Sequence, residues 1–196
     1  MKKLTLVLAS CLLLFASTAF PQENTKQHFI YTGIGTLSAP EIVSKFVDVW
    51  LVALTAGYSG SDTRSAVPAV SLGYQFYQND RYSFGGSITY EKLVKDVAYG
   101  ARNAGKIEAV IASPMLEIRY EYASSESFGA YLGLGVGAAF ISSESNYDGK
   151  NESVSKTILA AQFEPVGLRF GKKFMVHAGL GFGMKGLLTC SIGYKF

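Results

Sequence analysis

The stretch that decides the fold is the last one, residues 173–196, which reads KFMVHAGLGFGMKGLLTCSIGYKF. It divides into two halves around Lys185 and Gly186, and in each half large apolar residues occupy every second position. The positions between them hold mostly glycine, serine, threonine, histidine and lysine. Because successive side chains of a strand point to opposite faces, each half is predicted to be a strand with one apolar face. Together the halves predict a β-hairpin with a tight turn at residues 185–186.

The polar side of this hairpin does not suit a soluble protein, because glycines cannot fill a hydrophobic core. It suits a barrel whose outside faces lipid and whose narrow interior is polar. The chain also ends on Phe196, with aromatic or apolar residues at every second position before it. This ending resembles the C-terminal signature of bacterial outer-membrane β-barrels, and the resemblance implies that the barrel assembly machinery of that membrane reads it.

The composition indicates one exported domain. A length of 196 residues allows a single domain, and 17% charged residues is too apolar a composition for a disordered chain. The N-terminus has the features of a secretory signal, with Lys2 and Lys3, an apolar run over 4–15 and small residues at 17–19. The predicted organisation is a signal peptide at 1–19, a polar arm at 20–28 and an outer-membrane barrel domain at 29–196, with cleavage nearer Gln22 as the alternative.

Charge and cysteine content exclude some classes of function. Without the two signal lysines the chain would carry 16 basic and 15 acidic residues, so its charge does not indicate nucleic-acid binding. Cys11 follows Leu8-Ala9-Ser10, as in a lipoprotein box, but the apolar run before it is short and apolar residues continue after it. Cys190 then remains alone on an outward strand face, where it is expected to be a small apolar residue in lipid.

Alternation along the rest of the chain brings the predicted number of strands to eight. The predicted strands cover residues 29–37, 67–77, 82–91, 110–122, 128–140 and 159–170, followed by the two hairpin halves. In the sixth, the apolar phase slips by one residue near Glu164-Pro165, which predicts a β-bulge. Longer polar loops are expected at 57–66, 96–105 and 142–153. The predicted fold is an all-β, closed, antiparallel, eight-stranded transmembrane barrel, and an even strand number fits such barrels.

One helix is predicted from about Ala39 to Ala53, in the first long connection. Ser38 and Glu41 form a capping box, and Pro40 lies in the first turn. Its apolar face consists of Ile42, Val43, Phe46, Val47, Trp50 and Leu51. We expect this face to pack against the barrel mouth, and the outer membrane interface is the alternative. A rival strand at 46–58 would make nine strands.

Aromatic residues collect beside the short turns and the C-terminus. The predicted periplasmic belt consists of Phe76, Tyr82, Phe84, Tyr120, Tyr122, Phe128, Phe170, Phe174, Tyr194 and Phe196. Such rings are favoured at the membrane interface, whereas the core of a soluble barrel would not gather them at one end. With the signal, the hairpins and the terminal Phe196, this belt makes the chain resemble small eight-stranded outer-membrane barrels over nearly its whole mature length.

The inward side of the strands carries polar residues that define a predicted lumen network. Its members are Glu91, Glu117, Arg119, Glu121, Gln162, Glu164, Arg169, His177 and Lys195. Eight strands leave an interior just wide enough for side chains, so a porin pathway is not expected. Acids and bases buried there must pair, and a structural network is favoured over a proton path or binding site.

The resemblance implies a membrane anchor, an adhesive surface or a stabiliser of the Gram-negative envelope. The alternatives are a lipid-A-modifying enzyme, which would need His, Ser and an acid at the lipid interface, and a small-ligand-binding, lipocalin-like barrel. His28 and His177 are the only histidines, and no outward triad includes either, so no enzymatic activity is expected. With no phosphate loop, metal-ligand cluster or basic patch, we expect no cofactor and no nucleic acid. Expected partners are outer-membrane lipid and the assembly machinery, with the barrel a monomer; no extracellular partner is indicated.

Overall fold

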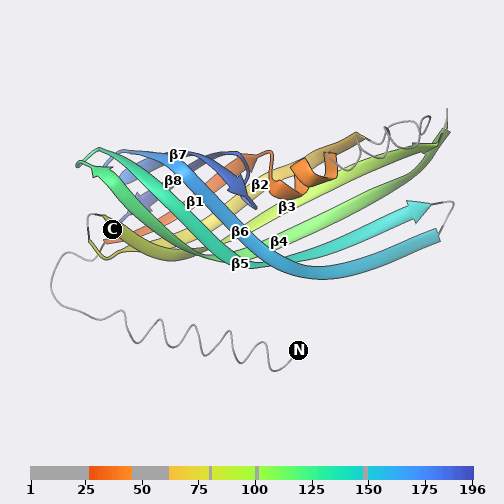
Figure 1. Ribbon diagram of the computed structural model, residues 1–196, viewed down its shortest axis with the longest axis horizontal. Helices are drawn as coiled ribbons and strands as arrows, with labels where there is room; N and C mark the ends of the chain where they lie inside the picture. The colour runs from red at the N-terminus through yellow and green to blue at the C-terminus, as the bar shows by residue number, and fades with distance from the viewer. Residues whose placement is uncertain (1–26, 46–61, 80, 100–101, 148–149) are drawn as a thin grey trace, which may run out of the picture.

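The protein is a closed antiparallel barrel of eight strands. The computed structural model describes residues 27–45, 62–79, 81–99, 102–147 and 150–196 (Figure 1). The strands are β1 Gln27–Thr36, β2 Asp62–Tyr77, β3 Tyr82–Tyr99, β4 Arg102–Ser124, β5 Phe128–Tyr147, β6 Lys150–Phe170, β7 Phe174–Gly183 and β8 Leu188–Lys195. Each strand pairs with its neighbours in the chain, and β1 pairs with β8 to close the barrel. The predicted fold class is confirmed.

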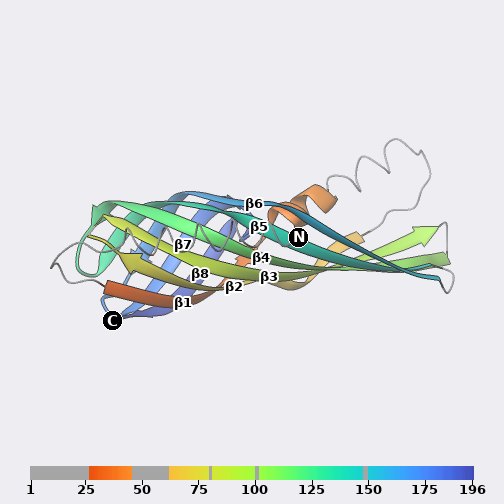
Figure 2. The ribbon, with the colours of Figure 1, turned by 90° about the horizontal axis from the view of Figure 1, so that it is seen from below.

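The strands differ in length, so the molecule has two parts. β1, β7 and β8 are 10, 10 and 8 residues long, whereas β2 to β6 have 16 to 23 residues. About ten tilted residues span a bilayer, so β2 to β6 continue past the closed barrel as a curved open sheet (Figures 1 and 2). This extended sheet consists of residues 62–68, 92–99, 102–110, 142–147 and 150–161.

The extended sheet corrects the predicted loops. Residues 62–66, 96–99, 102–105, 142–147 and 150–153 belong to strands, where the sequence predicted loops. A strand beyond the barrel needs no continuous apolar face, so its polar residues do not show the alternation that identifies a strand elsewhere. The predicted bulge is confirmed, because the pairing of β6 with β7 shifts register between Phe163 and Val166.

Apolar side chains cover the outside of the closed barrel. Every strand contributes at least one large apolar side chain that is more than 45% exposed; examples are Ile34, Leu72, Ile88, Leu116, Val136, Phe163, Leu180 and Ile192. The burial of β7 alternates strictly, with each inward residue buried and each outward residue exposed. An outer surface of this kind must meet lipid or another apolar partner.

Aromatic rings fill the space that inward glycines leave in the lumen. A Cβ added to Gly73 would lie 2.3 Å from the Tyr31 ring, and one added to Gly167 would lie 2.2 Å from the Tyr131 ring. The glycines therefore allow large side chains from other strands to cross the narrow interior.

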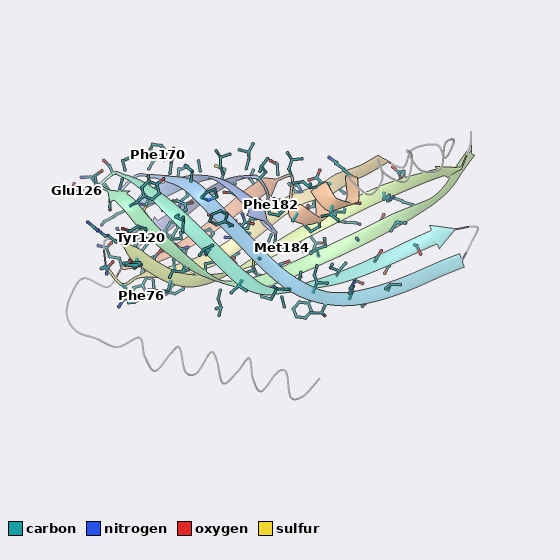
Figure 3. All side chains as sticks on the ribbon, viewed as in Figure 1. Phe76, Tyr120, Glu126, Phe170, Phe182 and Met184 are labelled. Carbon is teal, nitrogen blue, oxygen red and sulfur yellow. The ribbon has the colours of Figure 1, made fainter. Side chains whose placement is uncertain are left out.

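The turn between β7 and β8 folds into the mouth of the barrel. Gly183 and Gly186 have φ of +144° and +108°, which favour glycine. Met184 is 5% exposed and packs in an apolar cluster with Leu93, Ile111, Met115, Ala139 and Ala160, although the alternation of the hairpin predicts that it faces outward. The positive φ at Gly183 interrupts the alternation, so Phe182 stays outside while Met184 turns inside (Figure 3).

Residues 39–45 are helical, as predicted, and the helix begins after Ser38. The Ser38 hydroxyl accepts a hydrogen bond from the Glu41 backbone N–H at 3.2 Å. Of the predicted apolar face, Ile42 is half-buried and Val43 is 58% exposed, whereas Phe46, Val47, Trp50 and Leu51 lie outside the described residues. The predicted signal and most of the predicted arm also lie outside them, while the arm's last two residues, 27 and 28, begin β1. No described helix is long and apolar enough to cross a membrane.

Candidate functional site in the barrel lumen and on the extended sheet

Glu117 is the centre of the polar groups in the lumen. Its carboxylate lies 2.5 Å from the Lys185 Nζ and accepts a hydrogen bond from the Tyr31 hydroxyl at 2.9 Å. The Ser87 hydroxyl also donates to it, and a guanidinium nitrogen of Arg119 lies 3.6 Å away. These groups come from β1, β3, β4 and the β7–β8 turn, so the cluster joins opposite walls of the barrel. Both side chains of the Lys185–Glu117 pair are about 5% exposed.

Arg119 is held between two aromatic rings and a histidine. Its guanidinium lies 5.2 Å from the centre of the Tyr31 ring and 4.9 Å from that of Tyr131, in the range of cation–π attraction. One of its nitrogens is 2.8 Å from Nδ1 of His177. Because guanidinium only donates, Nδ1 must accept, so the ring of His177 is neutral and carries its proton on Nε2. The same ring stacks on Phe29 with centroids 4.8 Å apart.

A second ion pair lies towards the end of the barrel that carries the short turns. Arg169 donates two hydrogen bonds to the two carboxylate oxygens of Glu121, each 3.0 Å long. It also donates to the backbone oxygen of Ser125 at 3.1 Å. A two-pronged pair of this kind fixes geometry as well as charge. Lys195 lies nearby, with its ammonium 5.2 Å from the centre of the Tyr77 ring.

Further polar contacts hold the β7–β8 turn in the mouth. The Gln162 side chain accepts from the Lys185 backbone N–H at 2.8 Å and donates to the Gly186 oxygen at 3.3 Å. Glu164 accepts a hydrogen bond from the Thr189 hydroxyl at 3.1 Å. The turn is thus anchored by its backbone to β6 and by its lysine to Glu117.

The structure places every residue of the predicted lumen network inside the barrel. Eight of the nine are buried, and Lys195 is half-buried at the end with the short turns. The sequence patterns did not identify Lys185, which lies in the predicted hairpin turn, or Tyr31, which lies on the predicted strand at 29–37. Tyr131 was on the inward side, yet its ring was not expected to bridge the lumen to Arg119. Among the described residues of the closed barrel and the β7–β8 turn, four acids and four bases face the lumen: Glu91, Glu117, Glu121 and Glu164, with Arg119, Arg169, Lys185 and Lys195.

The ten residues of the predicted aromatic belt lie on the outward face at one end of the barrel. Figure 3 shows Phe76, Tyr120 and Phe170 around this end, together with Glu126 in a short turn. Rings on neighbouring strands lie close: the centroids are 5.0 Å apart for Tyr82 and Tyr120, 5.4 Å for Phe128 and Phe170, and 5.0 Å for Phe174 and Tyr194. His28 also stacks on Phe196, which joins the ends of β1 and β8.

The extended sheet has an open edge along β6. β7 pairs with β6 from Gln162 to Phe170, and the Met184 N–H donates to the Ala161 oxygen, so the described residues leave one side of residues 150–160 unpaired. Val154 is 63% exposed and Leu159 is 76% exposed on this stretch. On the interior strands of the same sheet, Glu108 lies 2.6 Å from both Lys92 and Lys106. The ammonium groups lower the pKa of Glu108 to about 2, mainly through the hydrogen bond from Lys106.

Fold and lumen together define a small, closed, eight-stranded antiparallel barrel with an apolar outside and a polar, filled inside. Comparison with solved structures gives matches of low sequence identity. One is Ail, the attachment invasion locus protein of Yersinia pestis, with 16% identity, a TM-score of 0.49, and 89% of this chain and 100% of that chain covered.

Two further solved structures match. The N-terminal β-barrel domain of Pseudomonas aeruginosa OprF has 11% identity and a TM-score of 0.49, with 89% of this chain and 100% of that chain covered. Ail in complex with the heparin analogue sucrose octasulfate has 16% identity and a TM-score of 0.46, with 87% and 97% covered. No protein-family model and no curated protein matches the chain.

Proposed function

We propose that this chain is an integral outer-membrane barrel that acts at the cell surface by binding other macromolecules through its extended sheet. The outward apolar side chains and the aromatic belt support a lipid-embedded barrel. The barrel is surrounded by outer-membrane lipid and interacts with the assembly machinery during biogenesis. Without a bound partner it is a monomer. The barrel is oriented with its short turns in the periplasm and its extended sheet outside the cell.

The observation that carries the proposed function is the open edge of β6. An exposed edge offers a row of backbone N–H and C=O groups to which another extended chain can add as a strand. Between Ser153 and Ala161 the edge carries one charged residue, Lys156, so little charge protects this part of the edge against pairing. A protein without such a binding role would need strands only long enough to cross the membrane.

The filled lumen supports a surface role over a general porin. The Tyr31 and Tyr131 rings cross the interior, and the Lys185–Glu117 pair closes it below the mouth. An eight-stranded barrel has just enough interior for such side chains. Solutes would have to displace a buried ion pair to pass.

Photocrosslinking in intact cells tests the proposed function. A photoreactive residue at Ser155, on the open edge, should give adducts with extracellular protein, whereas one at Ser142, its register partner on β5, should give few. Ser155→Lys should weaken the binding detected in this way, because charge on an edge opposes strand addition, and Ser142→Lys is the matched control. Equal adducts at the two positions, or equal effects of the two lysines, would argue against binding at the edge.

A further inference from the structure

A strip of hydroxyl side chains crosses the inner wall just below the mouth of the barrel. Ser71 on β2 pairs in register with Thr89 on β3, which pairs with Ser113 on β4. All three are buried; Thr89 is 2% and Ser113 is 1% exposed. Directly opposite side chains on one face of an antiparallel sheet have their Cβ atoms about 4.5–5.5 Å apart. The three hydroxyls therefore lie side by side, and this hydroxyl strip faces the lumen.

Two hydroxyls of the strip are unsatisfied. The Oγ1 of Thr89 and the Oγ of Ser113 have no hydrogen-bond partner among the described residues. Burying a hydroxyl without a partner is costly, and a native protein commonly places a water or an ion at such a point. A hydroxyl oxygen can bind such a water or ion through its lone pairs. The two neighbouring unsatisfied groups thus point to a ligand.

Glu91 lies on the same inner face of β3, two residues from Thr89, and is 2% exposed. The Ser38 hydroxyl is 2.7 Å from both of its carboxylate oxygens, but one hydroxyl proton serves only one of them at a time. The charged side chain that acts on Glu91 within the described part of the chain is another carboxylate, Glu41. Lys185 is engaged by Glu117 in the row below. A buried carboxylate that stays ionised needs a cation or further hydrogen-bond donors.

We propose that Glu91 and the hydroxyl strip bind one monovalent metal cation, Na⁺ or K⁺. Glu91 supplies the negative charge, and the Thr89 and Ser113 hydroxyls supply neutral oxygen ligands, which hard cations prefer. Lys45 already pairs with Glu41 at 2.8 Å, so Glu91 alone is left to balance one positive charge. A divalent ion would leave the buried site positive. Among the described residues no three His, Cys, Asp or Glu side chains form a cluster of the kind that holds a multivalent metal.

The bound cation links the helix to the barrel wall. Ser38 contacts Glu91 and caps the helix at residues 39–45, since the Glu41 N–H donates to its hydroxyl and the Ile42 N–H to its backbone oxygen. By neutralising Glu91, the cation stabilises the contact between the helix and the barrel wall at the mouth. The site lies inside the barrel, away from the β6 edge, so its test is independent of the proposed surface function.

Heat-induced unfolding followed by gel electrophoresis tests the cation site. The full, folded barrel in detergent is heated in NaCl or KCl, and in N-methylglucamine chloride of equal ionic strength. A saturating metal cation should raise the midpoint of unfolding by roughly 5 °C. Glu91→Gln and Thr89→Val keep the side-chain shape and should abolish the difference between the salts. Thr157→Val, on the exposed stretch of β6, should retain it.

Equal midpoints for the wild type in all three salts would overturn the site, as would a salt difference that survives in both site variants. Crystals of the wild-type barrel soaked in thallium acetate give a second test that does not depend on the folding of variants. Thallium replaces K⁺ and scatters anomalously, so we expect a peak between Glu91 and Thr89. Occupation by water alone, with no anomalous peak, would also overturn the site.

Discussion

The most definite prediction about stability concerns the buried pair Lys185–Glu117. Lys185→Met removes the ammonium 2.5 Å from Glu117 and leaves a carboxylate about 5% exposed in the lumen. Removing one partner of a buried pair typically costs about 3–5 kcal/mol, because the other charge is left uncompensated. Glu117 keeps its hydrogen bonds from Tyr31 and Ser87 and has Arg119 at 3.6 Å. We therefore expect a loss near the lower limit, about 3 kcal/mol.

Urea unfolding of the barrel in lipid vesicles measures this loss, and the chain offers a matched control. Lys172 and Glu126 are also 2.5 Å apart, but their side chains are 66% and 82% exposed in the short turns. Lys172→Met should leave the unfolding midpoint unchanged, because exposed pairs contribute little. Adding Glu117→Gln to Lys185→Met should recover part of the loss. Equal unfolding midpoints for the two lysine variants would refute the view that burial makes the lumen pair contribute more to stability than the exposed pair.

Three further predictions concern assembly, charge and packing. Phe196→Ala should lower outer-membrane levels more than Phe76→Ala, because the terminal residue also belongs to the assembly signature; equal levels by immunoblot would contradict this. The Glu108 carboxyl should titrate near pH 2 by NMR, so its ion pairs favour the folded state above its ordinary pKa and are lost as the pH falls towards 2. Lys106→Met should return that pKa towards its usual range, and an unchanged pKa would exclude the pair as the cause. Gly73→Ala places a Cβ 2.3 Å from a tyrosine ring and should destabilise the barrel by about 1–3 kcal/mol in urea; unchanged stability would show that the ring moves freely.

The closed barrel could be predicted because its strands must satisfy two environments at once. In β5, large residues such as Leu134 and Val136 alternate with glycines, and this pattern leaves only one choice of face. The bulge beside Pro165 was visible as a slip of the same alternation. The helix start could be predicted at Ser38, because capping residues act within one turn of chain.

The extended sheet could not be predicted because its residues have no single apolar face. The stretch from Ser142 to Ser153 is polar on both sides and has the composition of a loop, yet β5 and β6 pair through most of it. Pairing between neighbouring strands stabilises the extended sheet, and the local pattern of apolar residues does not indicate such pairing. Strand length beyond the membrane was therefore underestimated.

The lumen contacts depend on residues far apart in the chain. Tyr31 and Lys185 are 154 positions apart, and their side chains are 3.0 Å apart. The sequence predicted which residues face inward but not which of them meet, because that depends on barrel closure and on the turn at Gly183. Lys185 enters the lumen only because this turn folds inward, which alternation along a strand does not indicate.

Fractionation with heat-modifiable migration tests most directly the claim that the chain is a membrane-embedded barrel. The full chain is produced in a Gram-negative host, the membranes are separated, and samples are run with and without boiling. We expect the protein in the outer-membrane fraction, extracted only by detergent, with the unboiled form migrating faster than the boiled one. Recovery in the soluble fraction without detergent, or identical migration of the two forms, would contradict the claim.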